Sequence, residues 1–144
     1  MTSILVVDDD VAIREMLELV FAESGHEVQT ARDGSEAVDA LLLSLAPVVV
    51  VLDVKMPRMG GEEVIRLVAE GAPELTRHAF ILVSAAASSL SVDFLQLLKW
   101  LKIPLLAKPF KLEKLLTTVE AVATQLSARV DASMQSIQPR PQLD

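Results

Sequence analysis

A run of five aliphatic residues, 48–52, ends in a single carboxylate at Asp53. A continuous apolar run of this length, rich in β-branched residues, is typical of a strand buried on both faces of a parallel sheet, because a half-exposed strand alternates with polar residues. Ligands of open parallel sheets bind in the crevice at the carboxyl ends of the strands, so Asp53 lies where a functional carboxylate is expected. Asp is also a common turn residue, and Asp53 alone does not separate these two interpretations.

The composition favours one folded domain and excludes several classes of protein. With 144 residues, 51% of them hydrophobic, the chain is long enough to bury a sizeable core. It has no cysteine, which excludes a disulfide framework, a thiol nucleophile and cysteine metal ligands. The net charge of -7 argues against direct nucleic-acid binding, because phosphate contacts need clustered Lys and Arg.

The N-terminus lacks the pattern of a secretory signal, and no charge-free apolar stretch of about 18 residues is present. We therefore expect a cytoplasmic protein without a membrane-spanning segment.

Strand-like apolar runs alternate along the chain with apolar residues at helical spacing. Strands are expected at 4–7, 26–31, 48–53, 79–83 and 103–107. Helices are expected between Asp10 and Gly25, and at 37–45, 62–70, 91–101 and 112–126, with Asp10 as an N-cap and Gly25 as a stop. Five alternating strands and helices predict one α/β domain with a parallel sheet and right-handed crossovers.

Residues 1–126 are expected to form this domain, and 127–144 to hold the end of the last helix and a disordered polar tail, which has too few apolar residues to offset the entropy of ordering. The small side chains of 85–89 predict a mobile loop. The helix at 91–101 is apolar on most of its circumference, so it should be buried on more than one side or bind something.

Polar side chains that could form a site follow the first, third, fourth and fifth expected strands. They are Asp8, Asp9 and Asp10 after the first, Asp53 after the third, Ser84 after the fourth and Lys108 after the fifth. Each has an ordinary explanation, as a helix cap, a turn residue or a solvated charge. Because parallel strands end at the same edge of a sheet, together they predict one crevice with acids, a hydroxyl and an ammonium.

Clustered carboxylates need a partner of opposite charge. Like charges about 4 Å apart repel by roughly 4 kcal/mol at an effective dielectric near 20, so the acids must take up a proton or hold a cation. Oxygen ligands, few in number, favour Mg²⁺ with retained waters and a phosphate oxygen. Lys108 and Ser84 suit other phosphate oxygens. A carboxylate such as Asp53 can form an acyl phosphate, which predicts a phosphoryl group at this site.

Four sequence blocks resemble the receiver domain of two-component response regulators. They are residues 4–10 (ILVVDDD), 52–57 (LDVKMP), 83–85 (VSA) and 108–110 (KPF), in the order and spacing of that family, and the resemblance covers about residues 3–126. It implies a flavodoxin-like (βα)5 three-layer sandwich with strand order 2-1-3-4-5. It also implies a phosphoacceptor signalling domain rather than an enzyme, although the domain could catalyse its own phosphorylation and dephosphorylation.

By this resemblance, Asp53 accepts the phosphoryl group from a phosphohistidine on a sensor histidine kinase or phosphotransfer protein. Asp9, Asp53 and the backbone carbonyl of Lys55 bind Mg²⁺ directly, and Asp8 reaches it through water. Ser84 is expected to hold phosphoryl oxygens.

Lys108 has the same expected role as Ser84, and the bond from Lys108 to Pro109 is expected to be cis, as in the family.

Phosphorylation is expected to draw Ser84 and the loop after it toward the phosphate and to shift the helix at 91–101. That helix, the strand at 103–107 and the outer face of the last helix form the expected output surface for a downstream protein, with Ser84, Leu98, Trp100 and Leu105 as candidate residues. The alternative is that the apolar residues only complete the core. A phosphorylation-dependent dimer is a further expectation.

Several positions depart from the family pattern. Leu105 replaces the usual aromatic, so switching by an aromatic residue is in question, and 101–102 replaces a Gly-Ala pair. Gly60 stands where Asp is common. Lys55 and Ala86, which flank the path of attacking water, offer no carboxylate or amide to orient it, so the phosphoryl lifetime need not match that of a fast-cycling relative.

Two other functions fit part of the pattern. One is a receiver-like interaction module that is never phosphorylated. The other is a haloacid-dehalogenase-type phosphatase that uses Asp8, but its final acidic motif should follow the Lys, and here Asp53 precedes Lys108. No output domain follows the last helix, so the chain is expected to be either a stand-alone receiver or a fragment of a larger regulator or hybrid kinase.

Overall fold

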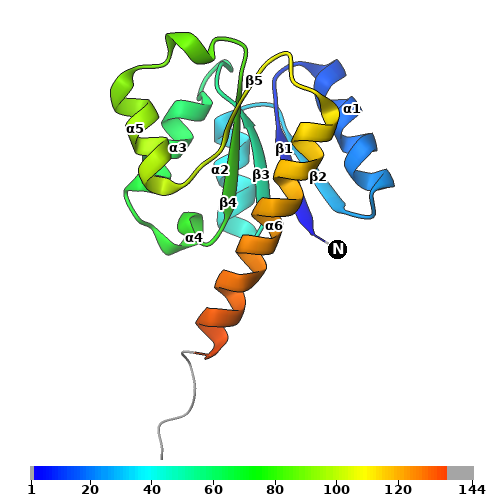
Figure 1. Cartoon of the computed structure of the whole chain (residues 1–144), viewed down its shortest axis with the longest axis vertical. Helices are drawn as coiled ribbons and strands as arrows, with labels where there is room; N and C mark the ends of the chain where they lie inside the picture. The colour runs from blue at the N-terminus through cyan, green and yellow to red at the C-terminus, as the bar shows by residue number, and fades with distance from the viewer. Residues whose placement is uncertain (1, 136–144) are drawn as a thin grey trace, which may run out of the picture.

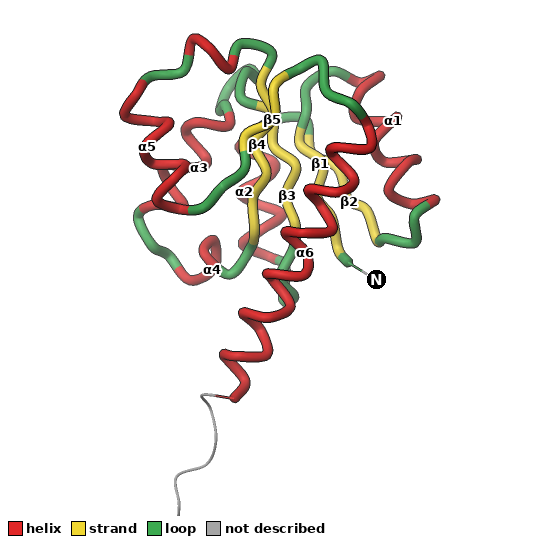
Figure 2. The backbone as a smooth tube through the Cα atoms, in the orientation of Figure 1, coloured by secondary structure: helices red, strands yellow, loops and turns green. Residues whose placement is uncertain are grey.

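The computed structural model describes residues 2–135, which form a five-stranded parallel sheet with helices on both faces (Figures 1 and 2). The strand order is β2-β1-β3-β4-β5, with every neighbouring pair parallel. The strands are β1 (Ser3–Val7), β2 (Glu27–Ala31), β3 (Val49–Asp53), β4 (Ala79–Ser84) and β5 (Leu105–Ala107). The predicted strands and their order are confirmed, with shifts of one or two residues at their ends.

The helices complete a three-layer sandwich. They are α1 (Val11–Glu23), α2 (Gly34–Leu43), α3 (Gly61–Ala69), α4 (Pro73–Thr76), α5 (Val92–Leu101) and α6 (Leu112–Gln135), with a 3-10 turn, η1, at Ala87–Ser89. Helices α1 and α6 cover one face of the sheet, and α2, α3 and α5 cover the other (Figure 1). This is the flavodoxin-like fold. No helix within residues 2–135 has the length and hydropathy needed to cross a membrane.

Strand β3 lies at the centre of the sheet and is buried along its whole length. Val50 and Leu52 point into the core under α2, α3 and α5, whereas Val49 and Val51 point into the core under α1 and α6. Successive side chains of a strand face opposite ways, so a strand between two cores needs apolar residues at every position. The unbroken apolar run therefore follows from the central position of β3.

Helix α1 begins and ends at the expected residues. The Asp10 carboxylate accepts hydrogen bonds from the backbone N–H groups of Ala12 and Ile13, at 2.9 and 3.3 Å. After the helix, Gly25 has a φ of 87°, a left-handed conformation that glycine adopts without a Cβ clash. The first strand thus passes directly into a capped helix, which fixes the direction of Asp8 and Asp9 between them.

Helix α6 is longer than the hydrophobic pattern predicted. The last buried core residue is Leu126, yet the helix continues to Gln135 and passes beyond the body of the domain (Figure 1). Residues 127–135 contain neither Gly nor Pro, and adding residues to an existing helix costs little. Arg129 also donates to the Thr76 carbonyl at 3.0 Å. The last helix thus ends at Gln135, inside the 127–144 segment expected to hold its end, and the expected tail at 136–144 lies outside the described residues.

Two other segments differ from expectation. The 85–89 segment, predicted as a loop, contains the 3-10 turn η1, in which the Ser89 hydroxyl donates to the Ala86 carbonyl at 2.8 Å. Helix α5 buries one side only, through Phe94 and Leu98, and exposes Val92 and Trp100. Since the sheet covers just one side of α5, Val92, Leu95 and Trp100 are exposed, while Leu97 and Leu101 are partly buried against the core.

Candidate functional site

Three carboxylates meet at the carboxyl edge of the sheet. Asp8 and Asp9 follow β1, and Asp53 is the last residue of the neighbouring β3, so the parallel pairing of these strands brings them together. One carboxylate oxygen from each residue lies within 4.8 Å of the other two. Asp8 and Asp53 are buried, whereas Asp9 is exposed. The predicted acidic cluster is therefore present, with one side open to solvent.

Lys108 reaches this cluster from the far end of β5. Its ammonium lies 3.0 Å from Asp8 Oδ2 and 3.4 Å from Asp53 Oδ1. The Lys108 backbone N–H donates to the Ser84 carbonyl at 2.8 Å, and the bond from Lys108 to Pro109 is cis, as expected. Lys108 is the basic residue that balances part of the negative charge of the carboxylates.

The electrostatics of the site make Asp53 the unusual carboxylate. Burial raises the pKa of Asp53 to about 6, and the charge of Asp8 adds to the increase, while Lys108 partly offsets it. Burial of Lys108 opposes its positive charge, but the hydrogen bond to Asp8 and the charges of Asp53 and Asp8 outweigh burial and raise the pKa of Lys108. At neutral pH the site holds a permanent ammonium beside a carboxylate that is costly to ionise.

Ser84 lies at the end of β4, one strand away from Asp53. It is 2% exposed, and its Oγ accepts a hydrogen bond from the Ala86 N–H at 3.1 Å. Within residues 2–135 the hydroxyl proton has no acceptor, so it can be donated to another group. Ser84 also connects two strands of the site, because its backbone carbonyl accepts from Lys108 N–H.

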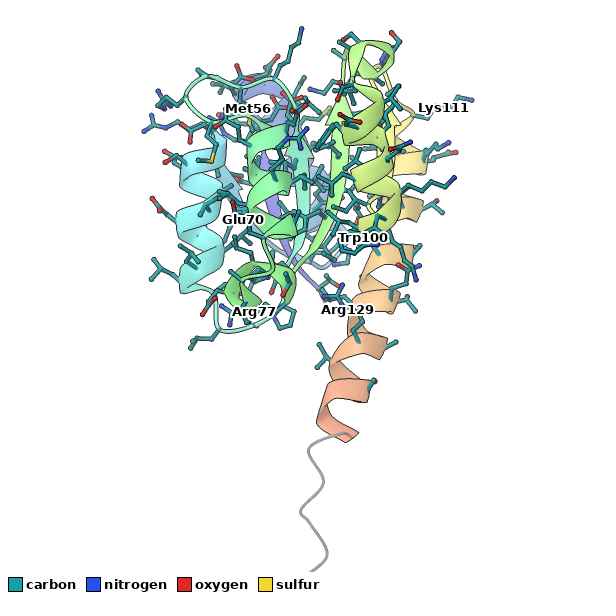
Figure 3. The ribbon with its side chains drawn as sticks, turned by 90° about the vertical axis from the view of Figure 1, so that its left-hand side faces the viewer. Met56, Glu70, Arg77, Trp100, Lys111 and Arg129 are labelled. Atoms are coloured by element: carbon teal, nitrogen blue, oxygen red, sulfur yellow. The ribbon has the colours of Figure 1, made fainter. Side chains whose placement is uncertain are left out.

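The loop between β3 and α3 forms the open side of the site. An open hollow beside Asp9 is lined by residues of this loop and of the start of α3, namely Val54, Lys55, Met56, Pro57, Gly60, Glu62 and Glu63. In Figure 3, the label of Met56 marks this loop at the same end of the molecule as Lys111, which follows β5, whereas Arg77 and Arg129 lie at the opposite end. Lys55 and Asp9 therefore line the same hollow.

The candidate output residues occupy different environments. Trp100 is 74% exposed on the outside of α5, and Leu105 on β5 is half-buried. Leu98 is 3% exposed and packs in the core under α5, so the structure does not place it on an output surface. Leu98 shares the buried side of the helix with Phe94, while Trp100 lies on the other side.

Sequence reasoning missed three supporting side chains. Arg14 on α1 donates to the Asp8 carbonyl at 2.8 Å. Asp33 is a buried N-cap of α2 and pairs with Arg58 of the β3–α3 loop. The Asp33-x-x-Glu36 spacing resembles a capping box and could have revealed the cap, but no sequence signal links Asp33 to Arg58.

The donor set of the site fits a hard divalent cation. Three carboxylates and one ammonium leave an excess of negative charge, and the oxygens come from residues with no sulfur or imidazole among them. Mg²⁺ is bound in proteins by one or two carboxylates, with its other positions filled by water and phosphate oxygens. Asp9 and Asp53 can supply the carboxylates, while Lys55 can supply a backbone carbonyl from the adjacent loop.

Comparisons with known proteins agree with this geometry. The family model for the response regulator receiver domain matches residues 4–120. The response regulator MprA of Mycolicibacterium vanbaalenii is 43% identical over 119 residues, which are 83% of this chain and 49% of the relative. The chain thus spans about half the length of the curated relatives it matches.

Two solved structures are similar to this chain in both fold and sequence. The chemotaxis protein CheY4 of Vibrio cholerae has a TM-score of 0.70 at 31% identity, covering 85% of this chain and 98% of that chain. The response regulator protein TrrA of Thermotoga maritima, in complex with Mg²⁺-BeF, has a TM-score of 0.71 at 30% identity, and the match covers 85% of this chain and 99% of that chain. With its strand order, its acidic cluster and these matches, the chain belongs to the response regulator receiver domain family of two-component signalling.

Proposed function

We propose that Asp53 accepts a phosphoryl group from a phosphohistidine of a sensor histidine kinase or phosphotransfer protein. A carboxylate oxygen of Asp53 forms the new bond to phosphorus as the bond to the imidazole nitrogen breaks, and the imidazole leaves. One observation carries the proposal: Asp53 is a buried carboxylate that shares one lysine with Asp8 and has a third carboxylate within reach.

The residues around Asp53 have distinct roles in this proposal. Asp9, Asp53 and the Lys55 carbonyl hold Mg²⁺ directly, and Asp8 holds it through water. When bound, Mg²⁺ neutralises the carboxylates and the incoming phosphoryl oxygens. The Lys108 ammonium and the free hydroxyl proton of Ser84 then bind phosphoryl oxygens.

The output follows from the position of Ser84. When the Ser84 hydroxyl donates to the phosphoryl group, its Oγ moves toward that group and draws with it the Ala86 N–H that it accepts from, at the beginning of the segment that leads into α5. Movement of this segment shifts α5 and its exposed Trp100. We propose that the downstream protein, or a second phosphorylated copy of the chain, binds the surface formed by α5, β5 and the outer face of α6.

The test is intact-mass measurement after incubation with acetyl phosphate or phosphoramidate. One added phosphoryl group is expected with Mg²⁺ and none with EDTA or in Asp53→Asn. No added mass in the presence of Mg²⁺ would favour the receiver-like module that is never phosphorylated. A label that survives Asp53→Asn but disappears in Asp8→Asn, or steady release of phosphate from small phosphomonoesters, would favour the phosphatase.

A further inference from the structure

The β3–α3 loop, residues 54–60, is closed at its base by its own backbone. The Gly61 N–H donates to the Val54 carbonyl at 2.8 Å, and a Cβ on Gly60 would lie 2.7 Å from the same oxygen. Gly60 precedes α3 without a side chain that could cap the helix. The base of the loop is therefore tightly packed, whereas the rest of the loop depends on contacts outside α3.

Those contacts come from the start of α2. Arg58 Nε and Nη2 lie 2.6 and 2.5 Å from Asp33 Oδ2. The other oxygen of Asp33 accepts from the Glu36 N–H at 2.9 Å, which caps α2. Next to this ion pair, the Gly34 N–H donates to the Met59 carbonyl at 2.8 Å. Two adjacent residues of the loop are thus attached to two adjacent residues at the start of α2.

The ion pair joins a buried carboxylate to an arginine whose side chain is 61% exposed and whose backbone conformation is unusual. Asp33 is 1% exposed, so its charge is stabilised by its hydrogen-bonding partners in the protein and hardly by water. The Glu36 N–H lowers the pKa of Asp33 against the effect of burial, and Arg58 lowers it further. Arg58 has a φ of 65°, in the left-handed region that few residues other than glycine adopt. A strained conformation of this kind persists where surrounding contacts fix it.

Lys55 belongs to the same loop, three residues before Arg58, and lines the hollow beside Asp9. We infer that Asp33 and Arg58 are positioning residues for Mg²⁺ binding: they hold the β3–α3 loop in the conformation that keeps the Lys55 carbonyl beside the acidic cluster. This inference rests on the proposed function, because it assigns a role toward the metal of that site. Neither side chain touches the acidic cluster, so the pair acts through the backbone of the loop.

The experiment measures the Mg²⁺ dissociation constant by isothermal titration calorimetry and the stability of each variant by urea unfolding. Arg58→Met removes the ion pair, and Arg58→Gly removes it while allowing the positive φ without strain. Asp33→Asn keeps a capping oxygen but removes the charge. Each is expected to weaken Mg²⁺ binding about tenfold, the usual scale for residues that orient metal ligands. Arg58→Lys should recover part of the affinity.

The control is Arg32→Met. Arg32 also forms a short ion pair, at 2.6 Å to Glu36, next to Asp33, but it has no contact with the β3–α3 loop among the described residues. The Mg²⁺ affinity of Arg32→Met should stay within about twofold of that of the unmodified protein, a smaller change than the loss of a residue that orients a metal ligand causes. The double variant of Asp33→Asn with Arg58→Met should bind no more weakly than either single variant, because both remove one interaction.

The outcomes separate this inference from the proposed function. If the unmodified chain binds Mg²⁺ and is phosphorylated, but Arg58→Gly and Arg58→Met keep their affinity or Arg32→Met loses as much, the positioning role is overturned. Additive losses in the double variant would also overturn it. If Arg58→Met does not fold, Arg58→Gly and Asp33→Asn decide. Failure of the unmodified chain to bind Mg²⁺ would overturn the proposed function itself.

Discussion

Replacing Asp53 with Asn should make the metal-free protein more stable, and the gain should depend on pH. Asn has nearly the shape of a protonated Asp, so it removes the charge but keeps the packing. The pKa of Asp53 is raised from 3.8 to about 6, chiefly by burial. Because each tenfold change in proton affinity is worth about 1.4 kcal/mol, ionising Asp53 at neutral pH costs the folded protein about 3 kcal/mol.

The sign follows from where the proton is bound. Between about pH 4 and 6, the folded protein keeps a proton on Asp53 that the unfolded chain has released, so stability falls as the pH rises and becomes level above about pH 7. Asn does not ionise, so Asp53→Asn is not destabilised in this way. Its advantage in free energy of unfolding should grow from about 1 kcal/mol at pH 4.5 to about 3 kcal/mol at pH 7.5.

The assay is urea unfolding in EDTA at both pH values, repeated with Mg²⁺. A bound cation stabilises the original protein by mass action and should narrow its difference from Asp53→Asn. Asp39→Asn, an exposed carboxylate of α2 with no ion pair within residues 2–135, is the control and should change stability little at either pH. An Asp53→Asn protein no more stable than the original at pH 7.5, or an advantage independent of pH, would refute this reasoning.

Two further predictions concern other buried charges and polar groups. Lys108→Met removes the cation 3.4 Å from Asp53, so the pKa of Asp53 should rise above about 6, and an NMR titration showing an unchanged or lower pKa would contradict the electrostatic account. His78→Phe removes the acceptor of the Val48 N–H, whose distance to Nδ1 is 3.0 Å, and should lower the free energy of unfolding at pH 7.5 by roughly 1–3 kcal/mol. Burial lowers the pKa of His78, so below about pH 6.5 the unfolded chain binds a proton that the folded protein does not. The loss of stability in His78→Phe should therefore be smaller at pH 5 than at pH 7.5. An equal loss at both pH values in urea unfolding would argue against a neutral buried imidazole.

The features predicted from the sequence are those that a short segment determines by itself. The apolar run before Asp53 reflects burial on both faces, and the polar residue after each strand falls at the shared edge because parallel strands all end there. The same reasoning located Lys108 and Ser84. The family resemblance then supplied the strand order, which local patterns do not contain.

The features that escaped prediction depend on contacts between distant residues. Arg58 and Asp33 are 25 positions apart, and neither residue alone shows that the other is present. Leu98 and Trp100 are both apolar residues of α5, and the position of the sheet decides which is buried. The sequence placed the end of the last helix within 127–144 but could not locate it at Gln135, because hydrophobic periodicity indicates contact with a core and a helix can continue without one.

The end of α6 projects beyond the last buried residue, Leu126, so it would amplify a rotation of the helix. Helix α6 starts at Leu112, four residues after Lys108, and reaches about 36 Å to Gln135 at 1.5 Å per residue. A tilt of about 10° at its base would move its far end by about 6 Å, since a rigid helix converts a small rotation into a displacement proportional to its length. Because Leu115, Val119, Val122 and Leu126 hold the first half of α6 against the sheet, a rotation of the helix as a rigid body would be carried to its projecting end (Figure 1).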